Sequence, residues 1–332
     1  MNRKGITRYK VVITLGLLLA GTNIIGCGIR ENKAESEISL QETVLIESEE
    51  SDSYQDKNVD LQETESVPNN IEEIQMSQQT FILPEGETLE TRIATPEGYE
   101  RIGAEEGSLT DFMRKYAMKP DGSPVLLYDG REKYNQNVHA AVFELPIEEA
   151  DLQQCADSVM RVYAEYYWQN GQYDKIGFHF TNGFWCDYVT WREGHRVHVN
   201  GNNVSWSKDA SYDDSYECFV KYLRMVFNYA GTLSMDSLES KTISLSEMTV
   251  GDVILTGGSP GHVVMVADVC VNEAGEKAFL LAQGYMPAQE FHVLNNPLHE
   301  QDPWYYETEM TFPLCTAEYV FDDASMIRRL SY

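Results

Sequence analysis

The chain has 332 residues and carries 53 acidic against 25 basic side chains, which gives a net charge of −28 at pH 7. A field of that sign repels phosphate, so binding to nucleic acid through a basic patch is excluded, and anionic lipid headgroups are not attracted either. Apolar residues make up 42% of the sequence, which is enough for a packed core and rules out a wholly disordered chain. The length allows about two domains of roughly 150 residues each.

The first 26 residues have the composition of a secretory signal peptide. All four of their charges are positive and fall before an apolar run over residues 11–19. Residues 24–27 read Ile-Ile-Gly-Cys, which resembles the bacterial lipobox. That resemblance implies cleavage after Gly26 and a lipid on Cys27, and hence a lipoprotein held on the extracytoplasmic face of the cell membrane. An ordinary signal peptide and a single membrane-spanning helix are the alternatives.

A strongly acidic segment follows. Residues 31–80 contain 14 acidic and two basic residues, no glycine and one aromatic residue. Such a segment cannot bury enough apolar surface to offset the entropy of the chain. We therefore expect residues 27–80 to form an extended, disordered tether, and residues 81–332 to form a single globular domain.

The cysteines exclude two common kinds of site. With Cys27 committed to lipid, five remain, at positions 155, 186, 218, 270 and 315. No pair has the Cys-x-x-Cys spacing of a zinc knuckle or a thioredoxin-type motif, and we expect no metal or other cofactor. Because five is an odd number, at least one thiol stays free, either buried as a small apolar group or kept for chemistry.

Secondary structure alternates in the first half of the predicted domain. A serine followed three residues later by an aspartate is an N-cap pattern that predicts a helix over residues 109–118. Short β-type runs predict strands over residues 125–128 and 140–145. A proline, an acidic first turn and apolar residues at helical spacing predict a long helix over residues 146–168.

The second half is richer in strands. Runs of β-type residues between 176 and 206, broken by Asn-Gly and Glu-Gly pairs, predict a β-meander. A second main helix is predicted over residues 212–229. Four further strands are predicted over residues 253–256, 263–269, 279–282 and 291–294. Two main helices packed against a mainly antiparallel sheet define the α+β class.

One segment suggests chemistry. Residues 251–262 join two strands through a glycine-rich corner that presents His262 at the start of a strand, where the backbone leaves room for a ligand. The strand after it ends at Gln283. If these two strands pair as a hairpin, the Gln283 amide can orient the His262 ring. An imidazole held in this way is the base that a thiol nucleophile needs.

The glycine corner resembles the papain-like cell-wall hydrolases of the NlpC and CHAP type. The matching positions are Gly251, Asp252, Gly261, His262 and, at the place of the third polar residue, Gln283. The resemblance implies a papain-like core and a thiol amidase or peptidase that acts on cell-wall peptide or glycan outside the membrane. The Asp-Cys-Ser/Gly tripeptide that usually carries the nucleophile in these enzymes does not occur in this chain.

Two cysteines compete for the role of nucleophile. Cys218 lies near the start of the helix that precedes the Gly-Asp strand, which is the position that the topology of those enzymes implies. Cys155 belongs to a wider resemblance, to a family of bacterial secreted lipoproteins known only as a domain of unknown function. The strings that carry this second resemblance lie at residues 127–131, 151–157, 229–232, 251–262 and 282–289.

Plainer interpretations stand beside these. Cys155 lies on the apolar face of its predicted helix, where a thiol is buried and inert, and Cys218 fits an incidental surface thiol. His262 fits a polar group satisfied at a turn. The acidic and basic residues at 157, 161 and 165 have the spacing of a solvent-exposed ion-pair row. The alternative function is a binding lipoprotein that keeps the cleft but has lost the nucleophile.

Overall fold

The computed structural model describes residues 79–332. The predicted signal peptide, the lipidation of Cys27 and all but the last two residues of the predicted tether lie outside the described residues. Within residues 79–332, no helix combines the length and the apolar character needed to cross a membrane.

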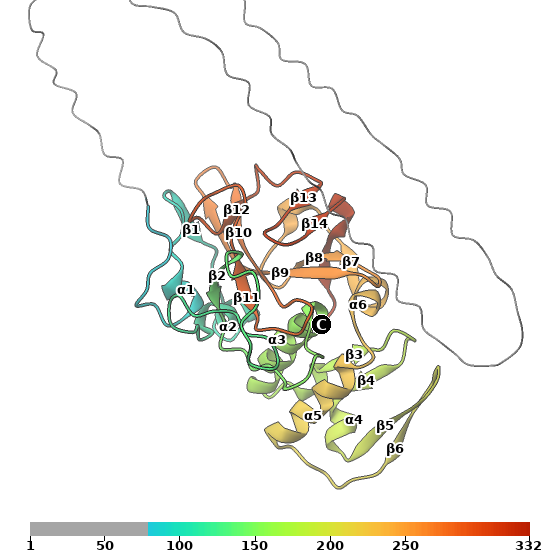
Figure 1. The fold of residues 1–332 in the computed structure, drawn as a ribbon. Coiled ribbons are helices and arrows are strands. Elements are labelled where there is room, and N and C mark those ends of the chain that lie inside the picture. Colours follow the sequence, from blue (N-terminus) through green and yellow to red (C-terminus); the bar gives the residue numbers. More distant parts are fainter. Residues whose placement is uncertain (1–78) are drawn as a thin grey trace, which may run out of the picture. The chain divides into compact units, whose positions relative to one another are not determined.

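A large antiparallel sheet organises the described residues and confirms the predicted α+β class (Figure 1). Its strands follow in the order β2 (His139–Val142), β11 (His292–Leu294), β10 (Lys277–Gln283), β9 (His262–Asn272), β8 (Val253–Thr256), β15 (Ile327–Leu330) and β7 (Ser240–Thr242). Two short strands pair outside this order, β1 (Tyr99–Arg101) with β9 and β12 (Trp304–Tyr306) with β10. The four strands predicted in the second half of the chain are therefore neighbours in one sheet.

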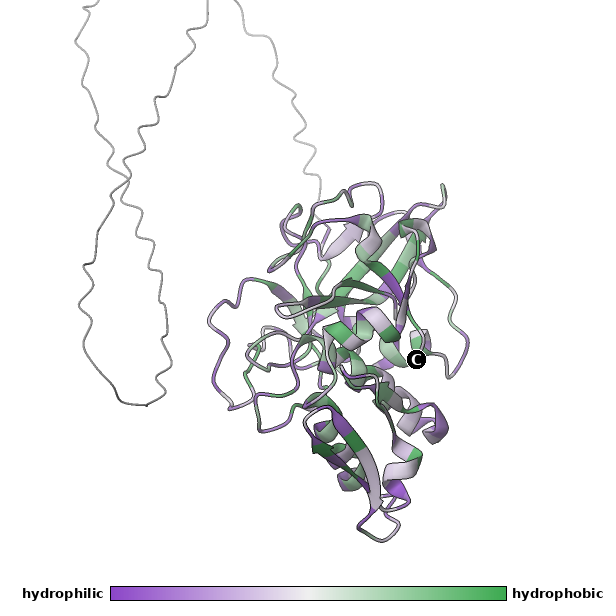
Figure 2. Cartoon of the chain, turned by 90° about the vertical axis from the view of Figure 1, so that its right-hand side faces the viewer, coloured by the Kyte–Doolittle hydropathy of each residue, from purple (hydrophilic) through white to green (hydrophobic). Residues whose placement is uncertain are grey.

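The centre of the sheet is buried because its sequence is mostly apolar, and the buried carboxylate of β9, Asp268, is paired with Arg101 and Arg114. Residues 262–270 of β9 are all buried, and so are residues 278–283 of β10. A continuous apolar run is typical of a strand that is covered on both faces. Figure 2 shows the apolar residues gathered on these strands. The helices α2 (Leu109–Lys115) and α3 (Cys155–Gln169) pack against β9.

The longest helix begins nine residues later than the sequence predicts. Residues 146–154 are irregular, with one turn at residues 151–152, and α3 starts at Cys155. The reason is local: the Asp157 carboxylate Oδ2 accepts the backbone N–H of Gln154 at 3.1 Å, which caps the helix at this point. The predicted start at Pro146 was wrong, and the correction moves Cys155 from the interior of a helix to its first turn.

The second main helix packs on the first. It is α5 (Tyr216–Phe227), and it contacts α3 and the short helix α4 (Tyr188–Arg192). Two further short helices, α1 (Leu89–Arg92) and α6 (Thr232–Leu238), were not predicted. The predicted strand over residues 125–128 forms only isolated bridges.

The predicted β-meander is instead two separate hairpins with α4 between them. They are β3 (Gly177–His179) with β4 (Trp185–Asp187), and β5 (His195–Asn200) with β6 (Asn203–Lys208). Figure 1 shows both hairpins beside α4 and α5. A last hairpin, β13 (Leu314–Cys315) with β14 (Val320–Phe321), lies near the C-terminus. Three 3₁₀ turns complete the fold, at Tyr173–Lys175, Leu245–Glu247 and Ala324–Met326.

The charged residues of α3 are buried, contrary to the predicted solvent-exposed row. The exposed fractions of Asp157, Arg161 and Glu165 are 6%, 0% and 3%. Arg161 donates hydrogen bonds to Glu165 on its own helix and to Tyr216 on α5. The buried guanidinium therefore has hydrogen-bond partners inside the protein. The spacing along the helix was read correctly, but the face is covered by α5 and by the segment that precedes α3.

Candidate active site

Cys155 occupies the first position of α3. Its side chain is 8% exposed. Burial raises the pKa of the Cys155 thiol to about 11, and the negative charge of Asp157 acts in the same direction. The nearby backbone N–H groups of Ala156 and Val263 act in the opposite direction, because they stabilise the thiolate. At neutral pH the group is therefore a thiol rather than a thiolate.

The contact with Val263 brings two distant segments together. Val263 directly follows His262 in β9, and α3 packs against β9. Cys155 therefore lies close to the start of the strand that carries His262.

His262 and Gln283 lie side by side. The strands β9 and β10 pair as an antiparallel hairpin, and His262 Nε2 is 2.7 Å from Gln283 Oε1. An amide oxygen only accepts hydrogen bonds, so Nε2 carries the proton and Nδ1 has the free lone pair. Within residues 79–332, Nδ1 makes no hydrogen bond. Burial lowers the pKa of His262 to about 4, although the hydrogen bond to Gln283 opposes this shift.

Aromatic rings enclose the imidazole. The ring centroids of Tyr285 and Tyr319 lie 4.8 and 4.7 Å from that of His262, and Phe321 stacks at 6.1 Å. Only 3% of His262 is exposed. The surrounding rings contribute to the burial that keeps the imidazole neutral at physiological pH and makes it a weaker base than a free histidine.

The other candidate nucleophile lies in a different environment. Cys218 is 1% exposed, so it is not the surface thiol that the plainer interpretation expects. Burial raises the pKa of its thiol, and the neighbours that influence it include Asp213, Arg196 and Trp191. His262 and Gln283 are not among these neighbours. Among the groups that influence Cys155 is the backbone of Val263, the residue after His262, and no residue of β9 is among those that influence Cys218.

An open cleft adjoins Cys155. Its volume is about 370 Å³, and its walls come from residues 151–157, 227–233 and 258–261, with Thr181 and Met286 completing the lining. The hydroxyl of Thr232 donates to the carbonyl of Gly258 at 2.9 Å, which ties two of these walls together. No lysine, arginine or histidine lines this cleft, so His262 lies behind its wall, next to the lining residue Gly261. It is suited to neutral or cationic groups rather than to carboxylates.

Asp157 adds a polar atom to the lining. Its Oδ2 caps α3, whereas its Oδ1 is buried without a hydrogen-bond partner within the described residues. Burial raises the pKa of Asp157 to about 8, although the backbone N–H of Gln154 opposes the shift. Near neutral pH the side chain is therefore largely a carboxylic acid, and it places little negative charge beside Cys155.

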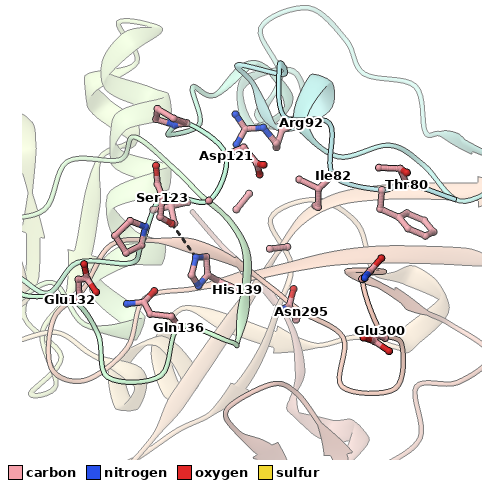
Figure 3. Close-up of a pocket in the computed structure, with 18 residues that line it drawn as sticks. Thr80, Ile82, Arg92, Asp121, Ser123, Glu132, Gln136, His139, Asn295 and Glu300 are labelled. Carbon is pink, nitrogen blue, oxygen red and sulfur yellow. Dashed lines mark hydrogen bonds between the residues drawn. The ribbon is translucent and has the colours of Figure 1, made fainter. Parts of the chain in front are cut away.

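A larger cavity lies elsewhere, against the edge strand β2 (Figure 3). Its volume is about 860 Å³, and Arg92, Asp121 and His139 are among its polar lining residues. Figure 3 shows His139 hydrogen-bonded to the backbone of Ser123, at 3.2 Å. No cysteine lines this cavity, so it offers no thiol nucleophile. The smaller cleft at Cys155 is the candidate active site.

Three polar residues near the Gln283 amide were not predicted from the sequence. Gln283 Nε2 donates to Glu318 at 2.7 Å, Glu318 forms a salt bridge with Lys133, and His292 is 3.5 Å from Gln283 Nε2. These residues come from separate loops and strands. No local motif marks them, because their roles depend only on how the fold brings the segments together.

Glycine at position 284 lets β10 approach the first turn of α3. A Cβ there would lie 2.2 Å from Ser158 Oγ and 2.9 Å from the backbone oxygen of Gln154. We expect Gly284→Ala to lower the free energy of unfolding by about 1–3 kcal/mol through overpacking. Gly103→Ala is the control, because nothing lies within 4 Å of its Cβ. Equal denaturant midpoints for the two variants would contradict the close approach.

The fold and the site together define an α+β protein with a buried histidine–glutamine pair and a cysteine at the first position of α3. The family described as Domain of unknown function (4846) matches residues 89–328. The chain belongs to this family. The search of the curated proteins and the search of the solved structures gave no significant match.

Proposed function

We propose that this protein is a cysteine hydrolase of amide bonds, with Cys155 as nucleophile and His262 as general base. The observation that carries the proposal is the orientation of the imidazole. Its Nε2–H is bonded to Gln283, so the free Nδ1 is the atom that can accept a proton. The thiol of Cys155 lies against the backbone of the next residue, Val263, at the N-terminus of a 15-residue helix.

The reaction uses these groups in order. Nδ1 of His262 takes the thiol proton while the sulfur of Cys155 attacks the amide carbonyl carbon. Backbone N–H groups at the start of α3 stabilise the oxyanion that forms. The C–N bond then breaks, the proton passes from His262 to the leaving amine, and a thioester remains. Water, deprotonated by the same imidazole, hydrolyses the thioester and releases the acid.

The substrate class follows from the expected location. A signal peptide over residues 1–26 and a lipid on Cys27 would hold the domain at the extracytoplasmic face of the membrane. The amides available there are those of cell-wall peptides and of other extracellular peptides. The resemblance of the glycine corner to NlpC and CHAP hydrolases supports the same class. The cleft beside Cys155 has no cationic residue, so it favours substrates without a carboxylate next to the scissile bond.

A binding protein without hydrolase activity is the second candidate function. The observation that favours it is the thiol itself, because burial raises the pKa of Cys155 to about 11 and an unassisted thiol of that kind is a poor nucleophile. The two functions differ in whether His262 activates the sulfur. They can be separated without knowledge of the substrate.

The test is alkylation of the full chain with iodoacetamide at pH 7, followed by peptide mass mapping. We expect His262→Ala to slow the labelling of Cys155 by about 100-fold, which is the usual contribution of a general base. Cys315 is the internal reference, since it is exposed. Cys218 is a second reference, because it is buried like Cys155 and His262 is not among the groups that influence its pKa.

The pH dependence provides the control. Above about pH 10 the Cys155 thiol begins to ionise without a base. The labelling rates of Cys155 in the parent protein and in the His262→Ala variant should therefore become more similar. Labelling of Cys155 that is slow in both proteins at every pH below 9 would reject the hydrolase and leave the binding function.

A further inference from the structure

The glutamine behind the imidazole has two chemically different ends. Gln283 is fully buried, with Oε1 toward His262 and Nε2 toward Glu318. If the amide turned over, its NH₂ group would face His262 Nε2, which would then have to supply the lone pair. The ring proton would move to Nδ1. An Nδ1–H cannot accept the proton of the Cys155 thiol, so this orientation is unproductive.

Glu318 is the group that distinguishes the two ends. It lies in the turn between β13 and β14, and its Oε2 accepts from Gln283 Nε2 at 2.7 Å. A carboxylate has no donor, so it can pair only with the NH₂ end of the amide. The Glu318 side chain is 13% exposed and the Lys133 side chain 8%, and the two form a salt bridge. The ion pair keeps Glu318 ionised inside the protein.

The remaining neighbour agrees with this orientation. His292 is fully buried, and its Nδ1 lies 2.9 Å from the backbone oxygen of Glu290, so Nδ1 is the donor. Burial lowers the pKa of His292, which leaves its Nε2 as an acceptor. That atom is 3.5 Å from Gln283 Nε2. Both groups behind the amide therefore accept hydrogen bonds from the same NH₂ group.

We propose that Glu318 is a positioning residue that fixes the tautomer of His262 through Gln283. The role of this tautomer depends on the proposed function, because a lone pair on His262 Nδ1 is useful only if Cys155 needs a base. The proposal itself concerns a proton position that can be observed directly. It adds Glu318 and Lys133 to His262 and Gln283 as parts of one hydrogen-bonded arrangement.

The test compares two substitutions in the full chain. Lys133→Met with Glu318→Leu removes the acceptor without leaving a lone buried charge. Glu318→Gln is the conservative variant, since its amide oxygen can still accept from both Gln283 and Lys133. The readout is the ¹⁵N spectrum of the histidine rings at pH 7, which distinguishes a protonated from an unprotonated ring nitrogen. Loss of a signal in His262→Ala assigns His262.

We expect His262 to be protonated only at Nε2 in the parent protein and in Glu318→Gln. In the double variant we expect a second population protonated at Nδ1, and labelling of Cys155 slower by about tenfold because the productive tautomer is diluted. A double variant that folds and keeps only the Nε2–H form would overturn the proposal. If only the proposed hydrolase function is wrong, the tautomers of His262 will change as expected but the labelling rate of Cys155 will not.

If the double variant does not fold, Lys133→Met alone serves in its place as a comparison with Glu318→Gln, with the spectrum recorded at pH 9. It removes the cation, and at that pH the Glu318 carboxylate stays ionised and accepts from Gln283, so the proposal requires the Nε2–H form. An Nδ1–H form in Lys133→Met would count against Glu318 as the orienting group.

Discussion

Replacing Arg161 with methionine is expected to lower the free energy of unfolding by about 3–5 kcal/mol, the usual cost of removing one partner from a buried ion pair. Arg161 is fully buried. It donates to Glu165 at 3.2 Å and to Glu148 at 3.1 Å, and it also reaches Tyr216 on α5. The substitution leaves Glu165 inside the protein without its cation and leaves Glu148 with only the half-exposed Arg224, 3.9 Å away. Chemical denaturation followed by circular dichroism measures the effect.

The control is an ion pair of the same spacing on the surface. Lys221 and Glu217 are four residues apart on α5, with side chains that are 59% and 78% exposed. We expect Lys221→Met to change the free energy of unfolding by less than about 0.5 kcal/mol. If the two variants unfolded at the same denaturant concentration, Arg161 would have to be solvated in the folded protein.

The Arg161 cluster also shows why burial could not be read from the sequence. An Asp–Arg–Glu series at intervals of four residues has the same pattern on an exposed face and on a covered one. What buries this series is Tyr216, which comes from a different helix, and Glu148, which precedes α3. These partners lie 55 and 13 residues from Arg161 along the chain, so the sequence around Arg161 does not predict them.

The sheet and the histidine–glutamine pair were easier to predict, because their signals are local. The continuous apolar run of β9 and the glycines before it indicate a buried strand that begins at His262. The next strand along the chain pairs with it as a hairpin, and this pairing carries Gln283 to the imidazole. The start of α3 could not be predicted in the same way. Helical spacing continues upstream of Cys155, and the chain departs from the helix there only because Asp157 caps it.

Asp157 is expected to make the protein less stable as the pH rises. Its pKa in the folded protein is raised to about 8 by burial, above the value of 3.8 for an unperturbed aspartate. Between these values the folded state holds a proton that the unfolded state has lost, so the free energy of unfolding falls with increasing pH. Asp157→Asn removes this titration. We expect the stability of the variant relative to the parent protein to increase by about 3 kcal/mol from pH 5 to pH 8.

The matched control is Asp111→Asn, at the equivalent third position of α2. Hydrogen bonding to Lys115 and to the backbone of Gly107 lowers the pKa of Asp111, so it is ionised in both states above pH 5. The difference in the free energy of unfolding between Asp111→Asn and the parent protein should therefore be the same at pH 5 and pH 8. A similarly constant difference for Asp157→Asn would mean that Asp157 is ionised beside Cys155. In that case a negative charge would oppose formation of the thiolate, and the proposed nucleophile would need a stronger base than His262 provides.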